Sequence, residues 1–200
     1  MRKLLAICHL SILLLASSFS TAQDKVEVYG KMKLEKGSLD GKVELFANGS
    51  RTSVRKVSGS GKFDFKLEYG NEYVISFSQE GYVTKKIAFN TNVPQDRQEF
   101  GFAPFEFQVT LFKQYEGVNF VVFNQPVAII KYDEDIGELG YDTDYTKSMQ
   151  QRLAAVQKEV EKKSKEEDKQ EKAKAKAKPE PKPKPEPTPK PPDLLLNGVT

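Results

Sequence analysis

The sequence predicts a mainly β protein: an antiparallel β-sandwich of about seven strands, then a β-hairpin, one C-terminal helix and a disordered Lys/Pro-rich tail. Three observations support this prediction. Between residues 26 and 111, apolar and polar residues alternate in short runs, which is typical of half-buried strands. Turn signals separate these runs at roughly ten-residue spacing, which favours an antiparallel sandwich. A single apolar stripe with helical spacing follows the strands.

The N-terminus has the pattern of a secretory signal peptide over residues 1–22. Two basic residues precede an apolar run that is too short to span a membrane, and small residues precede the expected cleavage between Ala22 and Gln23. The signal contains the only cysteine and the only histidine of the chain, Cys8 and His9. The mature chain would therefore lack disulfides, and it would lack the side chains that carry most imidazole, thiol and zinc chemistry.

Short alternating runs predict six strands, at 26–29, 42–46, 52–57, 62–67, 73–77 and 82–89. Asn48-Gly49, between the second and third of these, is a two-residue hairpin signal because both residues tolerate positive φ. The fourth strand alternates most regularly and places Phe63, Phe65 and Leu67 on one face.

The segment 93–144 is expected to be a β extension that completes or flanks the sandwich. A polar loop with Gly and Pro, 91–104, leads into it. Alternation and apolar runs predict strands at 105–111 and 118–123, followed by a hairpin made by 127–132 and 139–141.

A charged helix is expected over 145–178, capped by Thr143 or Asp144. Its apolar residues recur at spacings of four, three and four, which makes one stripe two heptads long, as in a coiled coil. We expect this stripe to dock on the chain's own sandwich or to support self-association with a second copy; its members are Met149, Leu153, Val156 and Val160.

Residues 179–200 are expected to form an extended, disordered tail, because proline alternates there with Lys, Glu and Thr. The net charge of the chain is +3, and basic residues exceed acidic ones only in the signal and from residue 146 onward. The tail is interpreted as a solvated spacer or as a contact to an anionic envelope surface. Leu194–Leu196 near its end form an apolar patch that is either a docking peptide or simply the end of the chain.

Four motifs resemble the carboxypeptidase regulatory-like domain, a transthyretin-like or prealbumin-like β-sandwich. The most specific is the run 70–82, in which a glycine precedes a Tyr-containing strand and Gly81-Tyr82 follows it; the others are 28–31, 39–43 and 61–65. On this resemblance the sandwich domain covers 23–92. The resemblance implies a non-catalytic accessory or surface-presented module, in a group with carbohydrate-binding relatives. Residues 100–148 also resemble the ending of small exported proteins of bacterial envelopes.

Two groups of side chains are candidates for ligand contacts. Aromatic rings could stack on a sugar, and we expect this of Phe100 and Phe102 in the loop and of Tyr82 at a strand end; core packing is the alternative interpretation. Tyr29, Tyr69 and Tyr115 belong to the same set of aromatics. Carboxylates could hold Ca²⁺, although their spacing is not that of an EF-hand and a solvated turn with a helix cap is the simpler interpretation; the candidates are Asp133, Asp135, Asp142 and Asp144.

These observations favour a non-enzymatic binding or structural module, exported to the periplasm or cell envelope of a bacterium, with the helix and tail as spacer or tether. The alternative is a carbohydrate-binding module of transthyretin-like fold. A hydrolase that uses two carboxylates is a third, less favoured hypothesis. Expected partners are an envelope protein or polysaccharide, and not nucleic acid. No cofactor, no catalytic residue and no membrane span after cleavage are expected.

Overall fold

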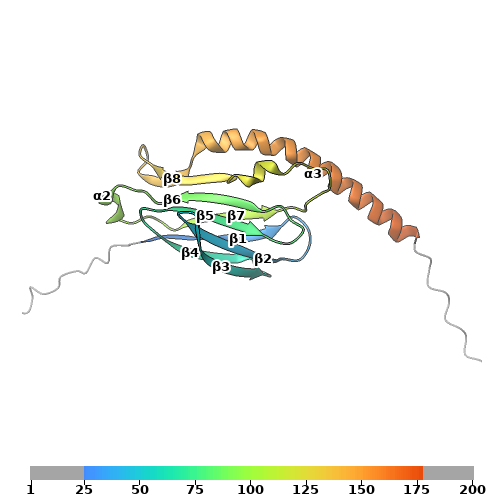
Figure 1. Cartoon of the computed structure of the whole chain (residues 1–200), viewed down its shortest axis with the longest axis horizontal. Coiled ribbons are helices and arrows are strands. Elements are labelled where there is room, and N and C mark those ends of the chain that lie inside the picture. The colour runs from blue at the N-terminus through green and yellow to red at the C-terminus, as the bar shows by residue number, and fades with distance from the viewer. Residues whose placement is uncertain (1–24, 178–200) are drawn as a thin grey trace, which may run out of the picture. The chain divides into compact units, whose positions relative to one another are not determined.

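The computed structural model describes residues 25–177 and shows two β-sheets packed as a sandwich (Figure 1). The expected signal peptide, with cleavage between Ala22 and Gln23, and the expected tail lie outside the described residues. The chain divides into two units between Glu161 and Lys162, and both sheets belong to the first unit.

A mainly β sandwich, with a hairpin and a single long C-terminal helix after it, is confirmed. The three-stranded sheet has the order β4-β1-β7, with β1 Lys25–Leu34, β4 Lys62–Glu68 and β7 Phe105–Leu111. The six-stranded sheet has the order β3-β2-β5-β6-β8-β9, with β2 Asp40–Ala47, β3 Ser50–Ser58, β5 Glu72–Ser78, β6 Lys85–Asn90, β8 Ala128–Asp133 and β9 Glu138–Tyr141.

Both sheets are mixed rather than purely antiparallel. Strand β7 pairs with β1 in parallel, and β8 pairs with β6 in parallel. Each parallel partner arrives after a long connection instead of a tight hairpin, which is the only way that parallel neighbours can be joined. The segment 93–144 thus contributes one strand to the first sheet and two to the second.

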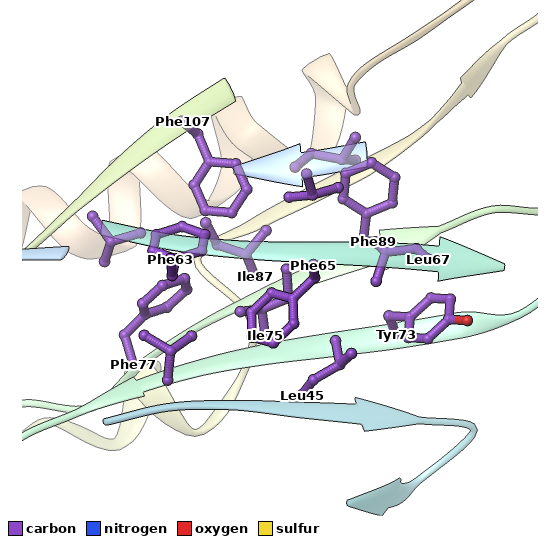
Figure 2. Close-up of a cluster of buried hydrophobic side chains, with 14 of the residues drawn as sticks. Leu45, Phe63, Phe65, Leu67, Tyr73, Ile75, Phe77, Ile87, Phe89 and Phe107 are labelled. Carbon is purple, nitrogen blue, oxygen red and sulfur yellow. The ribbon is translucent and has the colours of Figure 1, made fainter. Parts of the chain in front are cut away.

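The core fills the space between the two sheets and follows the alternation of the strands (Figure 2). The predicted face of β4 is buried, and the Phe63 ring contacts the Phe77 and Phe107 rings at centroid distances of 5.1 and 5.5 Å. Asn48 and Gly49 both have positive φ, 49° and 82°, and connect β2 directly to β3 as the hairpin signal predicts.

The run 118–123 was expected to be a strand, and this expectation is wrong. It leads instead into a short 3-10 helix, Val121–Asn124. The side chain of Asn119 accepts a hydrogen bond from the Val121 N–H at 2.9 Å, and the Phe123 N–H donates to the Phe120 carbonyl at 2.9 Å. These local bonds close the backbone into a turn, which is the usual alternative that Asn offers to a sheet ladder.

The expected loop 91–104 contains one short helix, α2, Gln95–Gln98. The strand expected from residue 82 begins only at Lys85, because Tyr82 forms an isolated bridge with Lys113 and stands outside the regular ladder.

The long helix α3 spans Thr143–Ala177. Its N-cap is Asp142 rather than Thr143 or Asp144: the Asp142 carboxylate accepts a hydrogen bond from the Tyr145 N–H at 3.0 Å. The same carboxylate lies 2.8 Å from the Lys131 ammonium, so strand β8 fixes where the helix begins.

The apolar stripe of α3 packs on the chain's own first unit. Met149 is 1% exposed and Val160 is 5% exposed. They belong to a second core, defined by Val83, Phe112, Val122, Phe123, Met149 and Val160, against which Leu153 and Val156 are half-buried. Of the two expectations for the stripe, docking on the chain's own residues is seen at Met149 and Val160, which are buried. Self-association through Met149, Leu153, Val156 and Val160 stays a prediction. Within residues 25–177, no helix has the length and apolar character that a membrane span requires.

Candidate functional site

An open groove of about 640 Å³ lies on the outer face of the six-stranded sheet. We call it the serine groove, because Ser76 and Ser78 of β5 lie at its centre. Its other lining residues come from β2, β3 and the turn between β5 and β6; they include Asp40, Lys42, Glu44, Lys56, Glu80 and Thr84.

The groove follows from the alternation of β5. Tyr73, Ile75 and Phe77 point into the core, so Ser76 and Ser78 point outward. Strand β5 lies between β2 and β6, and the longer side chains of β2 stand directly beside the serines: Glu44 pairs with Ser76 and Lys42 with Ser78. The small serine side chains on this central strand thus leave a hollow beside the longer side chains of the neighbouring strand.

Glu44 is the most buried charged side chain of the groove, at 9% exposure. Its two carboxylate oxygens lie 3.1 Å from the Lys42 ammonium and 3.1 Å from the Arg51 guanidinium. Burial acts to raise the pKa of the Glu44 carboxyl, but the hydrogen bonds and charges of Lys42 and Arg51 outweigh it, so this pKa lies below the ordinary glutamate value.

Glu44→Gln is expected to lower the free energy of unfolding by about 1 kcal/mol near neutral pH and to have little effect in strong acid. A carboxyl whose pKa is lowered by folding stabilises the protein above its ordinary pKa. That stabilisation is lost as the pH falls through the folded-state pKa, where Glu44 becomes protonated and resembles glutamine. Urea denaturation of both proteins across this pH range measures the effect, and an equal difference at every pH would contradict the assignment.

The floor of the groove carries an unused polar group. The Ser78 hydroxyl oxygen is buried and has no hydrogen-bond partner among the described residues. Nearby, the Gln79 side chain accepts a hydrogen bond from the Asp40 N–H at 2.9 Å and donates to the Ser38 carbonyl at 3.1 Å. One end of the groove is therefore fixed, and the Ser78 hydroxyl lies beneath the groove surface.

A serine beside a lysine raises the question of nucleophilic chemistry. A lysine that activates a serine must be neutral, with its nitrogen free to take the proton. Lys42, the strand partner of Ser78, instead holds the Glu44 carboxylate at 3.1 Å. Lys42 is thus engaged in an ion pair.

The structure separates the three residues expected to stack on a ligand. Phe100 is exposed at 79%. Tyr82 is half-buried, and its hydroxyl donates to the Lys36 carbonyl at 2.7 Å. Tyr82 lies in the connection that precedes β6, whereas Phe100 lies in the loop that follows α2.

The expectation that Phe102 stacks on a ligand is wrong. Its side chain is 5% exposed and belongs to the core between the sheets. The Arg97 guanidinium covers its ring at 5.7 Å from the centroid, and the Tyr132 ring meets it edge to face at 6.0 Å. Arg97 also donates to the Gly137 carbonyl at 2.8 Å, which ties the loop to the β8–β9 hairpin and closes it over Phe102.

Two of the four aspartates considered for Ca²⁺ serve a turn and a helix cap through their side chains. The Asp133 side chain accepts a hydrogen bond from the Asp135 N–H at 3.0 Å, and Asp142 caps α3 and binds Lys131. Asp133, Asp142 and Asp144 line a hollow of about 360 Å³, but Asp135 does not. Nowhere in the described part of the chain do three or more His, Cys, Asp or Glu residues gather so that they could hold a metal ion.

No family model and no curated protein matches the chain. Among solved structures, it is similar to 3-chlorocatechol 1,2-dioxygenase from Rhodococcus opacus 1CP, with a TM-score of 0.32 and 9% identity over 46% of this chain and 60% of the other. It is also similar to S.CueP, with a TM-score of 0.31 and 14% identity over 46% of this chain and 64% of the other. The chain spans less than two thirds of either protein, and likenesses at this level carry no argument about its function.

Proposed function

We propose that this chain is a non-enzymatic binding module, exported to the cell envelope of a bacterium, and that it holds its partner in the serine groove. The observation that carries the proposal is the groove itself, in which charged side chains of both signs stand around Ser76 and Ser78. Export is supported by the signal-like residues 1–22. The resemblance of residues 26–90 to a non-catalytic module agrees with a binding role.

The chemistry of the groove favours a polar, extended partner. The ammonium groups of Lys42 and Lys56 and the carboxylates of Asp40 and Glu80 stand around the two serines. A segment of an envelope protein offers donors and acceptors in alternation along its backbone, and such a segment matches this mixture better than an apolar ligand does.

The helix and tail are proposed as a spacer between the sandwich and the rest of the envelope. Helix α3 continues to Ala177, although its apolar stripe ends at Val160. From Lys162 to Lys178, the sequence is charged or alanine-rich and favours a helix without needing a packed face.

Filling the groove tests the proposal. Ser78→Trp places an indole on the groove floor, while Glu72→Trp places the same group on the same face of β5 outside the groove lining. Each immobilised full-length protein is incubated with solubilised envelope of the source organism. We expect wild type and Glu72→Trp to retain a common partner and Ser78→Trp to lose it. Equal retention by both variants, or no partner for the wild type, would contradict the proposal.

A further inference from the structure

We propose a second binding site on the outer face of the three-stranded sheet, which takes a carboxylated polysaccharide strand through Tyr29, Lys31 and Lys62. This site lies on the other sheet from the serine groove, and it gives the module a ligand class that the groove does not.

The strand register brings basic side chains together on this outer face. Tyr29, Lys31 and Lys33 are alternate residues of β1, and all three are exposed on the outer face. Lys31 lies directly opposite Lys62 on β4 and opposite Gln108 on β7. Like charges directly opposite in an antiparallel pair destabilise a sheet. The repulsion between Lys31 and Lys62 therefore lowers the stability of the fold, and a bound anion would reduce this repulsion.

Among the described residues, ion pairs neutralise only some of the lysines on this face. In the part of the chain that the structure describes, Lys31, Lys33 and Lys62 form no ion pair, whereas the other two lysines of this face are paired across strands. Those pairs are Lys25–Glu68 at 3.2 Å and Lys66–Glu27 at 3.0 Å. Three ammonium groups at one end of the sheet are thus available to an anionic ligand.

The surface around the lysines is hollowed. A hollow of about 430 Å³ is lined by Tyr29, Lys31, Lys62, Asp64 and Glu106, and a second, of about 280 Å³, lies on the other side of Lys31. The Tyr29 ring is 40% exposed. An exposed ring offers a face to the C–H surface of a sugar, and the flanking carboxylates can accept hydroxyl hydrogen bonds.

These features favour a glycan over a membrane surface. Asp64 and Glu106 would repel the carboxylates of a polysaccharide as well as a lipid headgroup, but only the polysaccharide carries sugar hydroxyls along its chain that donate hydrogen bonds to them. Every outward position of the three strands other than Tyr29 is polar, so no aliphatic side chain is placed to enter a bilayer. Lysines two residues apart on β1 stand about 7 Å apart, which suits a polymer that repeats its carboxylates.

Affinity electrophoresis of the full chain through gels containing polygalacturonate tests the proposal. We expect retention of the wild type, and at least about tenfold weaker affinity for Lys31→Gln/Lys62→Gln and for Tyr29→Ala. Tyr29→Phe keeps the ring and should bind like the wild type. Lys25→Gln/Lys66→Gln removes the same net charge from the same face and should change affinity less than about twofold, since these lysines are already paired.

Several outcomes would overturn the proposal. Equal losses in the two double variants would show attraction by net charge alone. Binding to phosphatidylglycerol vesicles without binding to polygalacturonate would point to a membrane, and equal retention in neutral dextran gels would remove the role of the lysines. Thermal unfolding shows that the variants are folded, and Lys31→Gln/Lys62→Gln should be slightly more stable than wild type. Ser78→Trp should bind polygalacturonate normally, so failure here is distinguishable from failure of the groove.

Discussion

Gly30→Ala is expected to destabilise the sandwich by about 3 kcal/mol or more, because there is no room for one additional methyl group. A Cβ at Gly30 would lie 1.9 Å from the Phe107 carbonyl oxygen and 2.9 Å from Cζ of Phe63. The carbonyl belongs to β7, which pairs with β1 in parallel at this residue. A backbone atom cannot rotate away as a side chain can, so the pairing itself must shift.

Gly70→Ala is the matched control. Gly70 has a φ of +75°, and nothing lies within 4 Å of the Cβ that alanine would add. Its cost is confined to backbone strain, of about 1 kcal/mol. Urea denaturation of the two variants beside wild type measures both values. Equal costs at Gly30 and Gly70 would show that the close approach of β1 to β7 does not limit the residue at position 30.

Met149→Asp is expected to detach the first half of α3 from the second core. Met149 is 1% exposed among Val83, Phe112, Val122 and Phe123, and a carboxylate placed there is buried without a partner. Undocking of the helix avoids the cost of burying this carboxylate. We therefore expect the first half of α3 to detach while the first core, between the sheets, stays intact. The expected loss in the free energy of unfolding of the docked state is about 3–5 kcal/mol.

Limited trypsin digestion measures this undocking. In the wild type, the Arg152 guanidinium donates to the Gln125 side chain at 2.9 Å, and the surrounding helix is docked. Met149→Asp should be cleaved after Arg152 much faster than wild type, and Gln151→Asp, an exposed position on the same helix, should behave like wild type. Similar cleavage rates in all three proteins would contradict the docking of α3.

The strands could be predicted from the sequence because the alternation of buried and exposed residues is contained within each strand. On β4 and β5, one face is aromatic or aliphatic and the other is polar, and the period of two is visible in the chain itself. The β8–β9 hairpin and the stripe of α3 were recognisable for the same reason.

The pairing of distant strands could not be predicted in this way. Nothing in the residues of β7 or β8 indicates that each lies parallel to its neighbour, because this is set by the path of long connections. Phe102 was misassigned because its burial depends on Arg97, which closes the loop through a carbonyl of the β8–β9 hairpin, forty residues away in sequence. The apolar run before Pro126 was misassigned because one side chain, Asn119, turns its backbone.

The sequence carries a signal for the serine groove. Two serines at alternate positions of an otherwise bulky strand, Ser76 and Ser78, mark the outward face as hollow if that strand is central. Whether a strand lies in the middle of a sheet depends on the order of the strands, and only the structure gives this order. In the same way, Tyr29 was visible as a candidate ring, but the opposition of Lys31 and Lys62 requires the register of β1 with β4.

Amide hydrogen exchange, measured on the full chain with and without the partner recovered from envelope, tests most directly whether the serine groove is the binding surface. We expect slower exchange on binding in the segments that form the groove, residues 40–44, 54–56 and 76–80. Protection confined to the three-stranded sheet or to α3, or no protection in any segment, would contradict a partner held in the groove.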